Sequence, residues 1–231
     1  MLLYDFIRYK LEDDEGFLPK LVPMLLKEAY MKNYTDHEKE FQDFYFPGIS
    51  WNDLDEMLPG LEQMLGDIQF RAGVLGTASL LSTHSSTYVM RYAYTQGPRL
   101  FTHRHPDPSK APPLPHKAGH GDEMALILPD LPHTYTPAQE DATTHLLDMV
   151  ENFAYGRAPR EDWPLFNSDT HPTLVFTENG DFKTEPFASP RHTKMLQNIH
   201  SYLHHDALER GGGGGGSGGA GGPGGGSKDE L

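Results

Sequence analysis

Apolar residues recur every three or four positions over much of this chain, a spacing typical of one face of an α-helix. The helices that this spacing predicts span residues 19–30, 37–46, 54–68, 70–83 and 192–207. Pro47-Gly48 ends the second of them, and Pro59-Gly60 predicts an interruption within the third. The fourth is rich in small apolar residues, so we expect it to be buried and to pack closely against a sheet.

One further helix has clear signals at both ends. Thr136 can cap it, Pro137 suits its first turn, and Gln139 completes a capping box. Gly156 is expected to end it, because glycine is the residue type most often found just after a helix. The side chains expected to form its buried face are Ala142, Leu146, Leu147, Val150, Phe153 and Ala154.

Strands are fewer and shorter than helices. Residues 88–95 are rich in aromatic and β-branched side chains and stop at Gly97-Pro98, which predicts a strand. Residues 173–177 predict a second strand, and Asn179-Gly180 predicts a hairpin turn after it. The expected structure is therefore rich in helix, with a small sheet.

The charge balance restricts the kinds of partner. Acidic side chains outnumber lysine and arginine by 33 to 19, which gives a formal net charge of -14. Such a surface repels phosphate backbones, so we expect no nucleic-acid partner, whereas neutral or cationic substrates suit it. The chain has no cysteine, so disulfides and thiolate chemistry are excluded. No apolar stretch approaches transmembrane length, so we expect no membrane span.

The C-terminal tail differs in composition from the rest of the chain. From Gly211 onward it is almost entirely glycine and serine, which cannot bury apolar surface. We therefore expect a folded part over residues 1–207 and a flexible, disordered tail over residues 208–231. The last four residues, Lys228 to Leu231, match an endoplasmic reticulum retention signal. This predicts a location in the lumen of that compartment and the KDEL receptor as a partner.

The N-terminus does not agree with the retention signal. Residues 1–5 lack the charged segment, apolar core and cleavage site of a signal peptide. A retention signal is read only in the lumen, so the chain must have a means of entering it. We interpret the sequence as a fragment whose upstream part held the signal peptide.

The strongest candidate for chemistry is His120, which lies between Gly119 and Gly121. Glycines let the backbone turn sharply, and histidine has the unperturbed pKa nearest neutrality, so a loop of this kind suits proton transfer. Asp122 and Glu123 follow, and we expect both to be structural, because acids at a helix start accept backbone amide hydrogen bonds. An ordinary surface histidine is the alternative interpretation.

A metal site is a second interpretation of the same region. The residues that could supply nitrogen and oxygen ligands for zinc are His103, His105, His116 and His120, with Asp107 and Asp122. Prolines separate them, and their spacing matches no known zinc motif. An ordinary polar loop explains them better, so we expect no metal and no cofactor.

Residues 118–128, AGHGDEMALIL, resemble the catalytic-histidine segment of the type B carboxylesterases and cholinesterases. Residues 151–159 and Trp163-Pro164 resemble the segment that follows it in that family, and residues 21–26, 66–70 and 88–94 occur upstream in the family's order. The resemblance covers roughly residues 15–207. It implies that residues 1–207 are the C-terminal part of a type B carboxylesterase-like domain, an incomplete α/β-hydrolase fold.

The resemblance also implies roles for particular residues. In the α/β-hydrolase arrangement a serine on a Gly-x-Ser-x-Gly elbow attacks the ester, a histidine acts as base, and an acid orients the histidine. His120 would be the base. Glu15, before Gly16, would be the acid, although it lies only 105 residues before His120 and belongs to an acidic run typical of a solvated loop. The alternative is that the acid lies upstream of Met1.

The attacking serine is not apparent in the chain. The one Gly-x-Ser-x-Gly match, residues 215–219, lies in the glycine-rich tail with no strand before it, so we reject it. We therefore expect the serine and the oxyanion-binding amides upstream, and an inactive, marginally stable chain with exposed apolar faces and strand edges.

Two functions follow from the resemblance. The first is a fragment of a luminal serine carboxylic-ester hydrolase that acts on a small ester substrate once the upstream part is present. The alternative is a non-catalytic, neuroligin-like adhesion or binding member of the same fold. The retention signal favours the enzyme, because an adhesion protein would need a membrane span.

Overall fold

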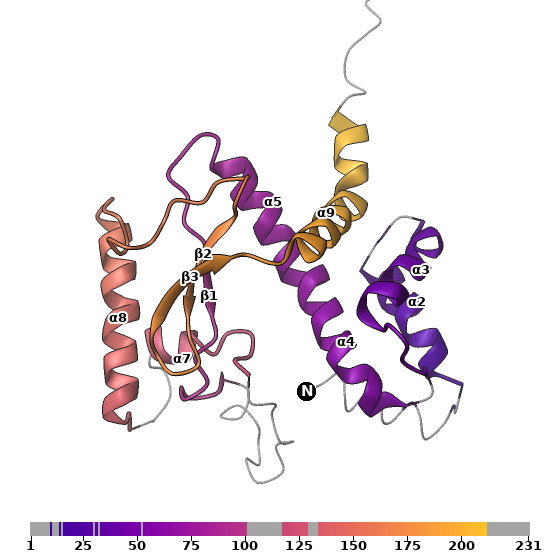
Figure 1. Ribbon diagram of the computed structural model, residues 1–231, viewed down its shortest axis with the longest axis horizontal. Coiled ribbons are helices and arrows are strands. Elements are labelled where there is room, and N and C mark those ends of the chain that lie inside the picture. The colour runs from indigo at the N-terminus through magenta and orange to yellow at the C-terminus, as the bar shows by residue number, and fades with distance from the viewer. Residues whose placement is uncertain are drawn as a thin grey trace, which may run out of the picture.

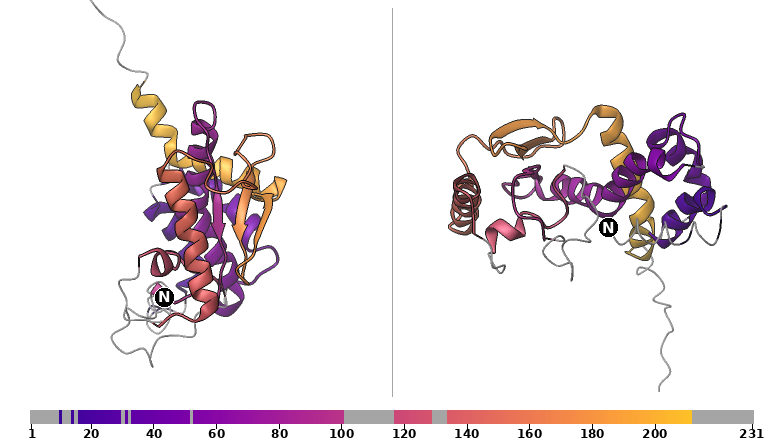
Figure 2. Two further views of the ribbon diagram at one scale, coloured as in Figure 1. Left: turned by 90° about the vertical axis from the view of Figure 1, so that its left-hand side faces the viewer. Right: turned by 90° about the horizontal axis from the view of Figure 1, so that it is seen from below.

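Two hydrophobic clusters organise the molecule, one among helices and one around a small sheet. The computed structural model describes residues 10, 14, 16–29, 31, 33–51, 53–100, 117–128 and 134–211. The elements are α2 (Leu18–Glu28), α3 (Tyr34–Tyr45), α4 (Leu54–Gly66), η1 (Asp67–Arg71), α5 (Ala72–Leu81), β1 (Met90–Tyr92), α7 (Met124–Ile127), α8 (Pro137–Ala154), β2 (Pro172–Phe176), β3 (Phe182–Pro186) and α9 (Pro190–Gly211). Helix α8 lies at one end, the sheet comes next, and the remaining long helices fill the other end (Figures 1 and 2).

The helical cluster joins α2, α3, α4, α5 and α9. Its side chains come from the apolar stripes that predicted these helices, and the helix bounds agree with that prediction to within a few residues at most ends. The largest fully buried members are Leu21, Leu26, Phe41, Met57, Met64, Leu75 and Leu196. Burying such side chains is the main source of stability for this half of the molecule.

The predicted interruption at Pro59-Gly60 is wrong. Helix α4 runs through both residues and continues without a gap into the π-helix η1 and then into α5. A β-carbon on Gly60 would collide with the carbonyl oxygen of Tyr45 and the ring of Phe46. The glycine therefore lets the end of α3 pack tightly against α4, and this tertiary contact outweighs the local tendency of the Pro-Gly pair to break a helix.

Helix α5 is not packed against the sheet as predicted. It contacts α9 and η1 instead. A β-carbon on Gly76 would collide with the ring of His200, so the small residues of α5 serve a close helix–helix contact. Leu80 and Leu81, on the far side of α5, are exposed.

The sheet has three strands in the order β1-β2-β3 within the described residues. Strand β1 pairs parallel to β2, and β3 pairs antiparallel to β2 across the predicted Asn179-Gly180 turn, where Gly180 has a φ of 92°. Only Met90–Tyr92 of the predicted strand 88–95 forms a ladder, although the Ala93 amide continues the bonding to the Phe176 carbonyl at 2.8 Å. Both outer strands leave an edge without a partner in the described part.

Helix α8 begins as predicted, with Thr136 and Gln139 forming a capping box. Its buried face is narrower than predicted and consists of Ala142, Leu146 and Met149, together with Gln139. The other apolar residues are exposed: Leu147 at 43%, Val150 at 50%, Phe153 at 63%, and Ala154. The small sheet and α7 cover only one side of the helix, which confirms the expectation of exposed apolar faces. None of the helices in the described part is long and apolar enough to span a bilayer.

Helix α9 is tied to α3 through one carboxylate. Glu40 accepts hydrogen bonds from the Tyr202 hydroxyl at 2.8 Å and from the Asn198 amide at 2.7 Å. The Tyr202 ring also stacks on His37, with ring centroids 3.7 Å apart. Burial, followed by the hydrogen bond to Glu40, raises the pKa of Tyr202 to about 12.

We predict that this contact makes the protein less stable in alkali. A phenol ionises near pH 10 in an unfolded chain, whereas the folded pKa is higher, so the folded state holds the proton more tightly. The stabilisation is complete below pH 10 and is lost as the pH rises towards 12. In urea titrations between pH 9 and 12, the free energy of unfolding should fall less steeply with pH for Tyr202→Phe than for the wild type. Tyr155→Phe, which changes an exposed tyrosine, should behave as the wild type; equal slopes for all three proteins would contradict the prediction.

Candidate functional site

His120 lies at the tip of a tight turn between Gly119 and Asp122. The Asp122 amide donates to the Gly119 carbonyl oxygen at 3.2 Å, and Gly121 adopts a φ of 83°, a conformation that favours glycine. The side chain of His120 is exposed. Helix α7 follows at once and lies at the carboxyl end of β1 (Figure 1). The glycines thus hold the imidazole at the molecular surface, beyond the end of a strand.

Asp122 is structural, as predicted. It is 5% exposed, and its carboxylate accepts hydrogen bonds from the amides of Gly119 at 2.8 Å and Leu100 at 3.0 Å. Glu123 behaves differently, because it precedes α7 without a side-chain capping bond. The phenol of Tyr92 lies close by. Burial, and then the charges of Asp122 and Glu123, raise its pKa.

The ring of His120 stacks on Phe70, with ring centroids 4.4 Å apart and planes 28° apart. Phe70 belongs to η1 in the helical half of the molecule, whereas His120 follows the sheet. The candidate base therefore lies where the two halves meet. One face of its ring lies against Phe70, and the residue as a whole is exposed.

Glu15 lies outside the described residues, so its role as the acid remains a prediction. The same holds for His103, His105, His116 and Asp107 of the metal interpretation. Within the described ranges, no three histidine, aspartate or glutamate side chains come together in a way that could hold a metal ion.

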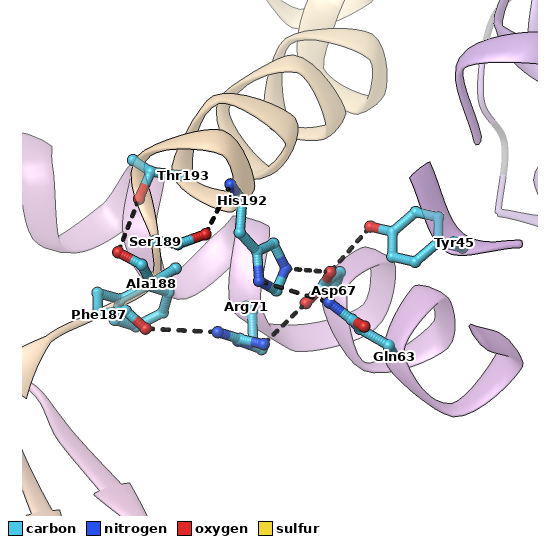
Figure 3. A network of polar contacts seen from close by, with 9 residues as sticks. All are labelled: Tyr45, Gln63, Asp67, Arg71, Phe187, Ala188, Ser189, His192 and Thr193. Atoms are coloured by element: carbon cyan, nitrogen blue, oxygen red, sulfur yellow. Dashed lines mark hydrogen bonds and ion pairs between the residues drawn. The ribbon is translucent and has the colours of Figure 1, made fainter. Parts of the chain in front are cut away.

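A second polar cluster is buried among the helices and centres on Asp67, which is fully buried (Figure 3). Its Oδ2 accepts a hydrogen bond from the Tyr45 hydroxyl at 2.8 Å and lies 2.5 Å from His192 Nε2. Its Oδ1 faces Arg71 Nη1 at 3.3 Å, an ion pair rather than a hydrogen bond. Burial and then the charge of Asp67 raise the pKa of Tyr45. Asp67 is therefore a buried acid whose charge is met by hydrogen bonding and by the Arg71 guanidinium.

Among the described residues, no hydroxyl completes a catalytic triad with this aspartate–histidine pair. The other ring nitrogen of His192, Nδ1, lies 3.5 Å from the Gln63 amide nitrogen and not next to a hydroxyl. The Ser189 hydroxyl accepts from the backbone amide of His192, so it caps α9 and does not face the imidazole edge. The cluster is therefore a structural tie. The sequence shows an acid within an apolar stripe, and such an acid needs polar partners when it is buried. It does not show which distant residues are those partners.

A cavity of about 910 Å³ lies near the end of β3 and the first turn of α9. Charged and polar side chains line much of it, including Arg71, Arg91, Glu185, His171, His192 and Lys194. His120 is not among its lining residues, so the cavity and the candidate base are separate features.

The order of a strand, a histidine turn and helices around a partly parallel sheet is that of part of an α/β-hydrolase fold. A family model, described as the Carboxylesterase family, matches residues 8–194. The chain belongs to this family, as the resemblance implied.

One solved structure supports this fold. The chain is similar to juvenile hormone esterase from Manduca sexta, solved with OTFP covalently attached, at a TM-score of 0.57 and 13% identity. The match covers 86% of this chain and 37% of that one, so this chain spans little more than a third of the esterase. An esterase from Clostridium hathewayi that can hydrolyze aliphatic aromatic polyesters aligns at a TM-score of 0.33 and 16% identity, over 79% of this chain and 32% of that one. A search of the curated proteins found no match.

We predict that Asp67→Asn destabilises the folded chain by about 3 kcal/mol, because it leaves Arg71 and His192 without the negative charge that they face. The free energy of unfolding, measured by urea titration followed by circular dichroism, checks this. Asp148→Asn makes the same chemical change at an exposed position of α8 and should leave the midpoint unchanged. The prediction is wrong if the two variants unfold at the same urea concentration.

Proposed function

We propose that this chain supplies the C-terminal part of a serine carboxylic-ester hydrolase in which His120 is the base of the catalytic triad. One observation carries the proposal. The exposed imidazole of His120 is held in a glycine-flanked turn beyond a parallel strand, in a chain that belongs to the Carboxylesterase family. In an open α/β sheet, functional groups gather outside the carboxyl ends of the strands.

The exposure of His120 suits the chemistry. A triad histidine takes the proton of the attacking serine and later gives it to the leaving alcohol, so its edge must be open to both partners. The stack on Phe70 occupies a face of the ring and leaves the edge for these transfers. We propose a small ester as substrate.

The remaining members of the machinery must come from elsewhere. The attacking serine and the amides that bind the oxyanion belong to the part of the fold that aligns outside this chain, and Glu15 is our candidate for the acid. The match covers only 37% of juvenile hormone esterase, which was solved with OTFP covalently attached. The proposed activity therefore requires the upstream part of the fold.

We predict that the 231-residue chain alone does not react with a fluorophosphonate probe, because the probe needs an activated serine. The same chain extended through the coding sequence upstream of Met1 should be labelled and should hydrolyse short-chain nitrophenyl esters. Labelling of the chain alone would contradict the proposal, and so would a completed protein whose elbow lacks serine, which would favour the non-catalytic binding member.

In the completed protein, His120→Gln should lower kcat/KM by about 10⁴-fold or more, the size of effect seen when a triad member is removed. His84→Gln replaces an exposed histidine just beyond α5 and should leave the rate unchanged. Comparable values of kcat/KM in the two variants would show that His120 is not the catalytic base.

We also propose that Lys228 to Leu231 keep the protein in the endoplasmic reticulum by binding the KDEL receptor. Behind a cleavable signal peptide, the chain should stay inside cells, and removal of these four residues should release it into the medium. Immunoblots of cells and medium measure the distribution. Equal secretion of both forms would contradict the proposal.

A further inference from the structure

Asp122 links the residue at the end of the segment after β1 to the turn that carries His120. Its Oδ1 accepts a hydrogen bond from the Leu100 amide at 3.0 Å, and its Oδ2 accepts one from the Gly119 amide at 2.8 Å. These two amides are 19 residues apart in sequence. Arg99 Nη1 also donates to the Lys117 carbonyl oxygen at 2.7 Å. Residues 99–100 and residues 117–122 are thus joined by two hydrogen bonds, one from Leu100 to Asp122 and one from Arg99 to Lys117, and the bond from Gly119 to Asp122 closes the histidine turn itself.

The same carboxylate sets the backbone on both sides of His120. Gly119 is bonded to Asp122 through its amide and its carbonyl group, and Gly121 is held at a φ of 83° between them. A β-carbon on Gly121 would lie 2.9 Å from a methyl carbon of Leu100. Little freedom remains for the backbone that carries the imidazole.

Both oxygens of Asp122 are engaged by backbone amides, so Asp122 is not the acid that orients the ring. The ring of His120 instead stacks on Phe70. The direction of the imidazole is therefore decided by the backbone beneath it and by that aromatic surface.

We propose that Asp122 is a positioning residue for His120: by bonding Leu100 and Gly119 together it fixes the turn that holds the imidazole against Phe70. Its importance for catalysis rests on the proposed function, in which His120 is the base. Displacing a catalytic group by about 1 Å can cost on the order of 10²-fold in rate, so a rigid backbone beneath the imidazole matters to such an enzyme.

The first test uses the full 231-residue wild-type chain and needs no variant to fold. Leu100 and Gly119 lie outside any ladder, and their amides should exchange with deuterium about 10-fold or more slowly than in an open loop, because each is bonded to a carboxylate. Site-resolved exchange by NMR measures this. Exchange of both amides at the rate of an open chain would overturn the proposal.

The second test follows the ring of His120, whose signals are assigned from their loss in His120→Gln. Stacking on Phe70 should displace these proton signals upfield. The chemical shifts measured in Phe70→Leu give the reference values without the stack. In Asp122→Asn, one acceptor oxygen becomes an NH₂ group, so one amide loses its partner and the His120 signals should move to the unstacked position. Glu123→Gln, the matched change at the neighbouring acid, should leave them in place.

Retention of the upfield signals in Asp122→Asn would show that Asp122 does not position the ring. This readout is a chemical shift and needs no turnover. If the esterase activity is not found, the NMR result on the position of the ring still stands. If the NMR test fails, the role of His120 as base is still tested by the activity measurements.

Discussion

A single buried carboxylate fixes where α3, η1 and α9 meet in the helical half of this protein. Taking the charge of Asp67 out of water is costly unless hydrogen bonds and an opposite charge replace the solvent. These come from Tyr45 on α3, Arg71 on η1 and His192 on α9, so the three elements must meet at one place. Strand β3 leads through Phe187, itself buried in the helical cluster, directly into α9. The position of the sheet therefore depends on the same contact.

The π-helix η1 links this core to the candidate site. It carries Asp67 inward and, three residues later, Phe70 outward to the ring of His120. π-helices are often found at functional sites, because their wider turn redirects side chains within an otherwise regular helix. Stability and site geometry thus share a short segment. Asp122 fixes the other side of the stack, so the imidazole is placed by two carboxylates, neither of which is bonded to its ring.

Much of the fold and part of the site follow from local sequence signals. The capping box of α8, the hairpin turn at Asn179-Gly180 and the glycines beside His120 act through contacts within a few residues, so each could be recognised in the sequence. The predictions failed where tertiary packing outweighed the local sequence signal. Helix α4 continues through Pro59-Gly60 because α3 lies against the glycine, and α5 packs on α9 where a sheet was predicted.

The sequence by itself determined the family, the helical stripes, the turns and the residue presented at the tip of the histidine turn. Only the tertiary structure decided which distant groups meet. Tyr45 and His192 reach Asp67 from 22 and 125 residues away, and Phe70 reaches His120 across the two halves of the molecule. The physical reason is that a local pattern states how much apolar surface a segment must bury and how its chain turns, whereas the partner of a buried charge depends on how the segments pack.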